Sequence, residues 1–354
     1  MASDRLWSET IEGELGGRLD EYMVGAVAHG FSGGVLVAKD GEVALHKAYG
    51  WADKERNLPM TNGTAHDVGS VTKMFTAAAI LELEEQGKLN VGGTIASYFD
   101  DVPEDKAGIT LHQLLTHTAG LPLYSGEDYD PVSRDALVLW ALNTQLESPP
   151  GRKYRYSNPS YSLLGAIVEA VSGRQYEEYV YERFFRPAGM LRTGYVIPQW
   201  DRNNVARGYA DGQDQGSPLD MEWLPDGPGW NLRANGGMLS NAGDLYLWFK
   251  AMQGGILLSE NAWRKLATPY VLAPTTPPKN AWSGYGVYLI ETARGTRIIA
   301  RSGTSQFGHT DAWYFADEGV MLIVLGNIEH STVWKVRNDL VDLIFGADAA
   351  TIAQ

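Results

Sequence analysis

The chain opens with a hydrophobic pattern that changes from a helical period to a strand period within fifty residues. Apolar positions recur every three or four residues over 10–29, which predicts an amphipathic helix. The next apolar segment, VLVAKDGEVALHKAYG at 35–50, is interrupted by the polar pair Asp40-Gly41. An Asp-Gly pair between two apolar runs is typical of a hairpin turn, so this segment predicts two antiparallel strands.

Most of the middle of the chain has the helical period. Six segments predict helices: 70–86, 110–117, 133–147, 159–172, 175–185 and 241–253. Four short apolar runs then predict strands at 284–290, 296–303, 309–316 and 319–327, and an amphipathic helix follows at 331–346. This order predicts an α/β (α+β) fold in which residues 1–69 and 271–354 build one antiparallel sheet flanked by helices. Residues 70–270 would form an inserted, mostly helical subdomain, with the functional site where the two bodies meet.

Composition narrows the function classes. The chain has 354 residues, of which 44% are hydrophobic, and its formal net charge is −14. An acidic surface repels phosphate backbones, which argues against nucleic acid as a partner. The sequence contains no cysteine, so disulfides and thiolate metal sites are excluded, and no histidine pair has the spacing of metal ligands. We therefore expect neither a metal nor a cofactor.

Membrane and export signals are also missing from the sequence pattern. No apolar run approaches the roughly 20 residues that span a bilayer. The first twenty residues lack the apolar core of a signal peptide. We therefore expect a cytoplasmic protein with no membrane partner.

The segment VGSVTKMF at 68–75 places Ser70 and Lys73 three residues apart at the start of a predicted helix. Residues i and i+3 share one helix face, so the hydroxyl and the amine are close enough for proton transfer. The first N–H groups of a helix lack intrahelical partners, so the Ser70 N–H can stabilise an oxyanion. Burial among the neighbouring apolar residues would lower the pKa of Lys73 and make it a base. The alternative is a helix-capping serine with an unrelated lysine.

A second polar cluster, YRYSNP at 154–159, offers Tyr156 and Asn158 directly before the helix predicted at 159–172. A tyrosine can relay a proton, and an amide can orient a substrate. Both residues also have structural explanations, because Asn158 suits a helix cap and Tyr156 can pack against the core. The second cluster gains meaning only in combination with the first.

Five blocks of sequence follow one another in an order that chance does not explain. They are VGSVTKMFTAAAILELEEQGKL, ITLHQLLTHTAGLP, YRYSNPSYSLLGAIVEAVSG, FFRPAGMLRTGY and ANGGMLSNAGDLYLW. In these blocks the chain resembles the serine β-lactamase-related hydrolases, the class C-like group. That group includes class C β-lactamases, D-alanyl-D-alanine carboxypeptidases, D-aminopeptidases, D-amino acid amidases and family VIII carboxylesterases. The resemblance implies an α/β sandwich beside a helical subdomain.

The resemblance also implies roles for individual residues. Ser70 and Lys73 match the family's S-x-x-K motif, and Tyr156 and Asn158 match its Y-x-N motif. Ser70 is then expected to form an acyl-enzyme, with Lys73 and Tyr156 as the other catalytic residues. Asn158 is expected to bind the substrate.

The family's third motif is Lys or His, then Thr, Ser or Gly, then Gly, and the matching place here is Arg301-Ser302-Gly303. The arginine departs from that pattern, since it keeps the positive charge but is effectively never deprotonated. By the same analogy Thr304 supplies the second oxyanion N–H. The resemblance thus implies that these four residues take part in substrate or oxyanion binding.

The charge of Arg301 would affect the pKa of the group that accepts the serine proton. A fixed cation lowers the pKa of a neighbouring ammonium such as Lys73, and it favours the phenolate of a neighbouring tyrosine such as Tyr156. We therefore expect the lysine and the tyrosine to share the acid and base roles as one coupled unit. The sequence leaves open which of them takes the serine proton.

Other patterns have structural explanations. The segment GFSGG at 30–34 satisfies G-x-S-x-G, but a helix precedes Ser32 and a strand follows it, the reverse of a nucleophile elbow. His117 follows a predicted helix, and we expect it to be structural. His309 comes shortly after the third motif; we expect it at the surface or a sheet edge, with the lining of the site as the alternative.

The irregular segment 195–236 bears on the substrate. It is rich in Gly, Pro and Asp, and it includes Trp200, Trp223 and Trp230. A long insert beside a site is often a wall or lid, and tryptophans there would favour an apolar or aromatic acyl group. The alternative is that they cover the helical subdomain. We therefore expect a small-molecule substrate and, first among the functions, a carboxylesterase for small or aromatic esters.

Four other functions stay open. A D-amino acid amidase or D-aminopeptidase must pair the ammonium of its substrate, for which Asp211, Asp214 or Asp226 could supply a carboxylate. An acyltransferase or a β-lactamase comes next. A non-catalytic, penicillin-sensor-like binding module is last, because the complete S-x-x-K and Y-x-N motifs are present.

Overall fold

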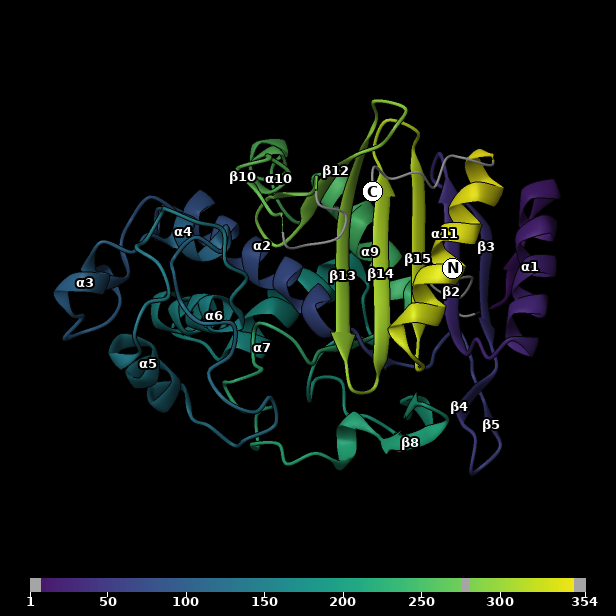
Figure 1. Cartoon of the computed structure of the whole chain (residues 1–354), viewed down its shortest axis with the longest axis horizontal. Coiled ribbons are helices and arrows are strands. Elements are labelled where there is room, and N and C mark those ends of the chain that lie inside the picture. Colours follow the sequence, from purple (N-terminus) through teal and green to yellow (C-terminus); the bar gives the residue numbers. More distant parts are fainter. Residues whose placement is uncertain (1–7, 275–279, 347–354) are drawn as a thin grey trace.

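The computed structural model describes residues 8–274 and 280–346, in which nine antiparallel strands form one sheet (Figure 1). The strand order is β1, β3, β2, β15, β14, β13, β12, β11, β10. The bounds are β1 Thr10–Ile11, β2 Gly33–Lys39, β3 Glu42–Tyr49, β10 Val271–Leu272, β11 Trp282–Ser283, β12 Tyr288–Glu291, β13 Arg297–Ser305, β14 Gly308–Phe315 and β15 Val320–Gly326. Because β2 pairs with β15, strands from both ends of the chain belong to one sheet.

Helices cover both faces of this sheet. Helix α1 (Gly13–Ala28) and helix α11 (His330–Phe345) pack on one face, and α9 (Ala242–Gln253) packs on the other (Figure 1). Alternate residues of β15 enter the two cores: Leu322 faces the α1 and α11 side, and Ile323 faces the α9 side. The continuous apolar run of β15 follows from burial on both faces.

Helix α2 (Thr72–Glu85) lies between the sheet and the remaining helices (Figure 1). Its residues from Thr72 to Leu83 are all buried, because α6 (Asn158–Ser172), α7 (Tyr176–Val180) and α10 (Glu260–Leu266) pack around it. The other α-helices are α3 Glu104–Ala107, α4 Leu111–Leu115, α5 Arg134–Asn143 and α8 Arg186–Ala188. None of the helices in the described residues is long and apolar enough to cross a membrane.

Short elements complete the structure. The small ladders pair β4 Trp51–Asp53 with β5 Leu58–Pro59, β6 His66–Asp67 with β9 Leu239–Ser240, and β7 Gly208–Ala210 with β8 Gln213–Gly216. The single turns of helix are η2 Gly69–Val71, η3 Ile95–Ser97, η4 Tyr181–Phe185, η5 Arg202–Asn204 and η6 Pro218–Asp220. Strand β6 ends just before η2 begins. Its pairing with β9 therefore holds the backbone that leads into the segment with Ser70.

The predicted fold class is confirmed, and the start of one helix is corrected. The chain makes a 3₁₀ turn at Gly69–Val71 before the α-helix starts at Thr72, because Gly69 has a left-handed φ of 49°. The predicted helical body ended at residue 270, but α9 within it packs against the sheet strands β2 and β15. The Phe249 ring of α9 lies 6.5 Å from the ring of Tyr314 on β14. Residues 1–7, 275–279 and 347–354 of the predicted sheet body lie outside the described residues.

The backbone of strand β13 lies in direct contact with the backbone of the η2 turn. A Cβ atom added to Gly303 would lie 2.0 Å from the Val68 carbonyl oxygen and 2.7 Å from the Ser70 nitrogen. A Cβ added to Gly69 would lie 2.8 Å from the Thr304 nitrogen. Real side chains do not fit such gaps, so glycine on both sides is what lets the sheet and the helical body meet here.

Replacing Gly303 by alanine should therefore force β13 away from the η2 turn. We expect Gly303→Ala to destabilise the fold by about 1–3 kcal/mol, the usual cost of overpacking a tight contact. Urea unfolding followed by tryptophan fluorescence measures it. Gly17→Ala is the matched control, since Gly17 is an exposed α1 residue with open space at its Cβ position; it should gain about 0.5–1 kcal/mol. Equal stability of Gly303→Ala and the wild-type protein would contradict the close contact.

Candidate active site

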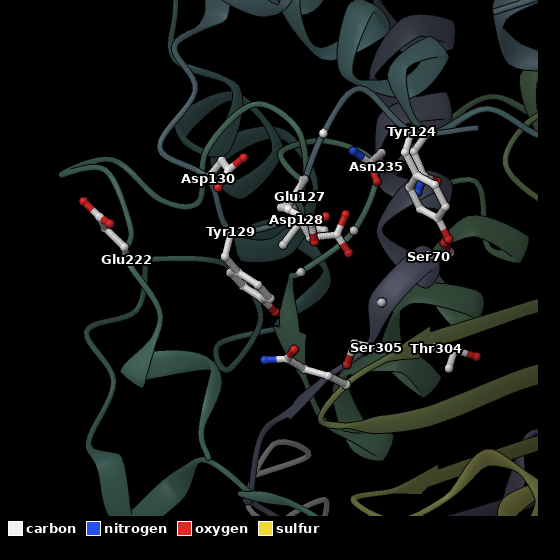
Figure 2. A pocket seen from close by; sticks show the side chains of 17 residues that line it. Ser70, Tyr124, Glu127, Asp128, Tyr129, Asp130, Glu222, Asn235, Thr304 and Ser305 are labelled. Atoms are coloured by element: carbon white, nitrogen blue, oxygen red, sulfur yellow. The ribbon is translucent and has the colours of Figure 1, made fainter. Parts of the chain in front are cut away.

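Ser70 lies in the η2 turn at the edge of a cavity of about 650 Å³ (Figure 2). The cavity lies between the helical body, the end of β13 and two loops. Its lining residues are Gly69, Ser70, Tyr124, Gly126, Glu127, Asp128, Tyr129, Asp130, Asn158, Glu222, Leu232, Asn235, Gly236, Gly237, Thr304, Ser305 and Gln306. A reactive hydroxyl at this position is open to a small molecule.

Lys73 lies one helical turn behind Ser70 and is completely buried. Its Nζ donates to Ser70 Oγ at 3.0 Å, to Asn158 Oδ1 at 2.8 Å and to the Asn235 carbonyl oxygen at 2.6 Å. Burial lowers the pKa of Lys73 to about 8, and the charge of Arg301 acts in the same direction. The ammonium is thus fully hydrogen-bonded yet close to losing its proton.

Tyr156 approaches Ser70 from the opposite side, just before α6. Its hydroxyl donates to Ser70 Oγ at 2.9 Å and accepts from Arg301 Nη2 at 2.6 Å. Burial raises the pKa of Tyr156, but the positive charges of Arg301 and Lys73 outweigh it and bring the pKa down to about 8. One proton can therefore move between the phenol and the ammonium, and Ser70 Oγ contacts both groups.

Arg301 on β13 is buried behind Ser70. Its Nε donates to the Ser70 carbonyl oxygen at 2.8 Å, and its guanidinium lies 5.3 Å from the centre of the Tyr288 ring. These contacts hold the cation against the phenol of Tyr156 and the backbone of the serine. Since a guanidinium keeps its proton, Arg301 supplies fixed charge and no proton shuttle.

Two backbone N–H groups are candidates for an oxyanion site, those of Ser70 and Thr304. Both residues line the cavity, and the glycine contact between η2 and β13 brings their backbones together. The side chain of Thr304 points away, because its Oγ1 bonds to Nδ1 of His309 at 2.7 Å. Only the backbone of Thr304 is therefore available to a substrate at this point.

Ser302 and His309 do not reach the cavity. Alternate residues of β13 face opposite sides of the sheet, so Ser302 points away from the side that carries Arg301. The Ser302 hydroxyl donates to the buried carboxylate of Asp311, and His309 lies 3.2 Å from the same carboxylate and accepts from Trp334 of α11 at 3.0 Å. Ser302 therefore does not make the expected substrate contact. His309 neither lines the site nor lies at the surface or a sheet edge, because it is buried on the inner strand β14.

The three tryptophans of the irregular segment also lie elsewhere. Trp200 and Trp223 pack against an apolar cluster that includes Val205. Trp230 is buried and packs with Leu137 of the helical body. Among the described residues, the aromatic side chains that line the cavity are instead Tyr124 and Tyr129. Trp230 thus covers the helical body, as the alternative explanation expected, while Trp200 and Trp223 are partly buried against other segments of the chain.

Carboxylates form the far wall of the cavity. Glu127, Asp128 and Asp130 come from one loop and Glu222 from another (Figure 2), and none of the four has an ion-pair partner among the described residues. Burial raises the pKa of Asp128, while the charge of Lys73 opposes that shift. Sequence reasoning missed this wall. The run GEDYD at 126–130 was its signal, but nothing in the sequence placed that loop beside Ser70.

The aspartates proposed to pair an ammonium are engaged elsewhere or distant. Asp214 forms an ion pair with Arg207 at 2.6 Å, and Asp226 forms one with Arg233 at 2.6 Å. Asp211 is exposed and does not line the cavity. The four carboxylates of the cavity wall are instead the candidates for pairing the ammonium of a substrate.

Ser32 and His117, which the sequence predicted to have structural roles, have structural partners. Ser32 Oγ bonds to the backbone N–H and carbonyl of Trp51, each at 2.9 Å. His117 is buried, its ring centre lies 4.3 Å from that of Tyr156, and its Nδ1 accepts from the Ser157 N–H at 3.2 Å. It therefore supports the segment that carries Tyr156. In residues 8–274 and 280–346 no group of three His, Asp or Glu side chains has an arrangement that would hold a metal ion.

Comparison with known proteins agrees with this geometry. The family model described as Beta-lactamase matches residues 19–345. The protein PbpX of Bacillus subtilis (strain 168) is 32% identical over 240 residues, which is 68% of this chain and 59% of PbpX. The matched region therefore spans less than two thirds of that relative.

Solved structures share the fold over nearly the whole chain. The octameric penicillin-binding protein homologue from Pyrococcus abyssi has a TM-score of 0.83 and 26% identity, covering 95% of this chain and 78% of that one. A D-amino acid amidase from Ochrobactrum anthropi SV3 (TM-score 0.80, 23% identity, 94% and 98% covered) and EstCE1, a hydrolase with promiscuous acyltransferase activity (TM-score 0.80, 21% identity, 94% and 98% covered), are similar in fold. The chain belongs to the beta-lactamase family and has the α/β fold of its serine hydrolases.

Proposed function

We propose that the protein is a serine hydrolase that forms an acyl-enzyme on Ser70 and acts on small amides or esters whose acyl part carries an ammonium group. The observation that carries this proposal is the position of Ser70. Its Oγ contacts Lys73 on one side and Tyr156 on the other, and it opens into a cavity whose far wall bears four carboxylates.

Acylation begins when the Lys73 and Tyr156 unit takes the Ser70 proton. Tyr156 accepts this proton as a phenolate, the form that the positive charges of Arg301 and Lys73 favour. Ser70 Oγ then attacks the carbonyl carbon, and the N–H groups of Ser70 and Thr304 bind the resulting oxyanion. The proton passes to the leaving amine or alcohol as the carbonyl bond reforms. The ammonium of Lys73, whose Nζ has three acceptors around it, provides positive charge beside the negative charge that moves during the transfer.

Deacylation repeats the same steps with water as the nucleophile. The Lys73 and Tyr156 unit takes a proton from the water, which attacks the ester carbon of the acyl-serine. The oxyanion returns to the N–H groups of Ser70 and Thr304, and the proton goes back to Ser70 Oγ. The product is a carboxylic acid, and Ser70 is free again.

The carboxylates of the cavity wall favour one class of substrate over others. An ammonium group on the acyl part of the substrate gains favourable electrostatic energy beside Glu127, Asp128, Asp130 and Glu222. A β-lactam or a peptide C-terminus carries a carboxylate, which the same wall repels. The argument for an apolar ester rested on tryptophans that pack elsewhere. The amidase alternative of the sequence therefore takes first place, and a neutral carboxylic ester takes second.

The proposed nucleophile can be tested by covalent labelling. Incubation with a fluorophosphonate followed by peptide mass mapping should place the adduct on Ser70, because its hydroxyl alone contacts the proton-accepting pair. Ser70→Ala should abolish labelling, and Ser32→Ala should leave it unchanged. An adduct on Ser32, or labelling of Ser70→Ala, would refute the assignment.

The role of Arg301 predicts a shift in the pH profile. Arg301→Met removes the cation that lowers the pKa of both Tyr156 and Lys73, so the acid limb of kcat/KM should move to higher pH. We also expect activity at pH 7 to fall by about 10- to 100-fold. Arg301→Lys keeps the charge and should keep the limb near its wild-type position. An unmoved limb in Arg301→Met would show that the charge does not tune the base.

The acidic wall predicts selectivity for cationic substrates. Asp128→Asn should raise KM for phenylalanine amide by roughly 10-fold, about 1.4 kcal/mol, and leave KM for phenyl acetate unchanged, because only the amide substrate carries an ammonium. Steady-state kinetics with both enantiomers of the amide measures this and the stereochemical preference. Asp135→Asn is the matched control, since Asp135 is an exposed residue of α5 that pairs with Arg134. Equal losses on both substrates would contradict ammonium recognition.

A further inference from the structure

Asp67 is a buried carboxylate that the proposed reaction does not use. It ends strand β6, three residues before Ser70, and its side chain is almost completely shielded from solvent. The ladder of β6 and β9 fixes its backbone through the pair Asp67 and Leu239. A buried carboxylate requires compensating hydrogen bonds, so its partners show what it stabilises.

The partners of Asp67 come from three different edges of the cavity. The Gly69 N–H donates to Oδ1 at 2.7 Å, and the Tyr129 hydroxyl donates to Oδ2 at 3.1 Å. Ser305 lies close enough to the carboxylate to lower its pKa. Gly69 belongs to the turn of the proposed nucleophile, Tyr129 to the loop with three of the wall carboxylates, and Ser305 to the end of β13; all three line the cavity.

The bond to Gly69 has a direct effect on the proposed oxyanion site. Gly69 holds a left-handed φ of 49°, and that conformation aims the following N–H, the one of Ser70. Ser305 follows Thr304, whose N–H is the second donor. One carboxylate thus anchors the residue before the first oxyanion donor and lies close to the residue after the second.

The bond to Tyr129 extends this anchoring to the acidic wall. Tyr129 lies between Asp128 and Asp130 in the sequence, so its hydroxyl bond to Asp67 fixes the position of the loop between them. Burial and the charge of Asp67 raise the pKa of Tyr129, so the phenol stays a neutral donor. Asn231 fixes the preceding part of the same loop by donating to the Glu127 carbonyl oxygen at 2.9 Å.

We propose that Asp67 is a positioning residue that joins the Ser70 turn, the end of β13 and the Tyr129 loop, so that the oxyanion donors and the acidic wall keep one geometry. The inference rests on the proposed role of Ser70 and adds to it a residue that touches no substrate. Charge matters to this role, since an ionised carboxylate can accept from Gly69 and Tyr129 at the same time and attract the Ser305 hydroxyl, while a protonated one must use an oxygen as a donor.

The positioning should therefore depend on pH. Burial raises the pKa of Asp67 to about 6, against the lowering effect of its donors Gly69, Ser305 and Tyr129, and the neighbouring charge of Asp128 raises it further. Among the described residues these are the groups that act on the carboxylate. The contribution of Asp67 is then complete above this pKa and is lost as the pH falls through it.

Asp67→Asn tests the proposal, because the amide keeps the shape but cannot accept at both ends. The readouts are the rate of fluorophosphonate labelling of Ser70 and kcat/KM for p-nitrophenyl acetate, from about pH 5 to about pH 9. Both should fall by about 10- to 100-fold at pH 8, as expected for misplaced catalytic groups. The ratio of wild-type to variant rates should fall toward one near pH 5. Because this ratio cancels the titrations that the two proteins share, a ratio that is constant with pH would overturn the proposal.

Asp53→Asn is the matched control. Asp53 is also a buried aspartate that accepts a backbone N–H, from Arg56 at 2.9 Å, but it lies on β4. Its ratio should stay near one at every pH. An equal effect of Asp53→Asn would show that the loss in Asp67→Asn is general destabilisation, and the proposal would fail.

Tyr129→Phe provides a second test that removes one hydrogen bond and leaves the carboxylate. It should lower the labelling rate by a few fold, and Asp67→Asn combined with Tyr129→Phe should lose no more than Asp67→Asn alone. Additive losses would contradict a shared interaction. If Asp67→Asn does not fold, Tyr129→Phe and Ser305→Ala replace it, and the pH-dependent ratio is still required of them. Failure of wild-type Ser70 to be labelled would instead refute the proposed function, so the two failures are distinguishable.

Discussion

The arrangement around Ser70 depends on keeping the ammonium of Lys73 out of water. A buried cation is expensive unless every proton finds an acceptor. The three acceptors come from separate segments: the η2 turn, the start of α6 and the loop at Asn235. These segments must converge within hydrogen-bond distance of one Nζ atom, so the burial of α2 between the sheet and the helical body is a requirement of the site.

The sheet contributes through the alternation of β13. Arg301 faces the helical body, where it holds the phenol of Tyr156 and the carbonyl of Ser70. Its neighbour Ser302 faces α11 and bonds to Asp311; burial raises the pKa of this carboxyl group, but the charge of Arg337 and the hydrogen bond from Ser302 outweigh burial and help to lower the pKa to about 2. One face of the strand is thus tied to the C-terminal helix while the other presents charge to the serine. Helix α11 contributes to the site without touching it.

The cavity has two electrostatic ends. Cations lie behind Ser70, where Lys73 and Arg301 lower the pKa of Tyr156, and carboxylates lie on the opposite wall. This polarity suits a substrate that develops negative charge at its carbonyl and carries positive charge some distance away. Asp67 lies outside this arrangement, but it bonds to the turn and the loop that form it and lies close to the end of β13.

The sequence by itself was enough to predict the fold class, most helices and strands, and the pairing of Ser70 with Lys73, because these follow from hydrophobic period and from residues three apart on one helix. Family resemblance added Tyr156 and Arg301, whose contacts with the serine region the structure shows. The acidic wall, the outward Ser302 and the packed tryptophans could not be read in this way. They depend on which loop lies across the cavity and which face of β13 each side chain occupies, and long-range packing decides both.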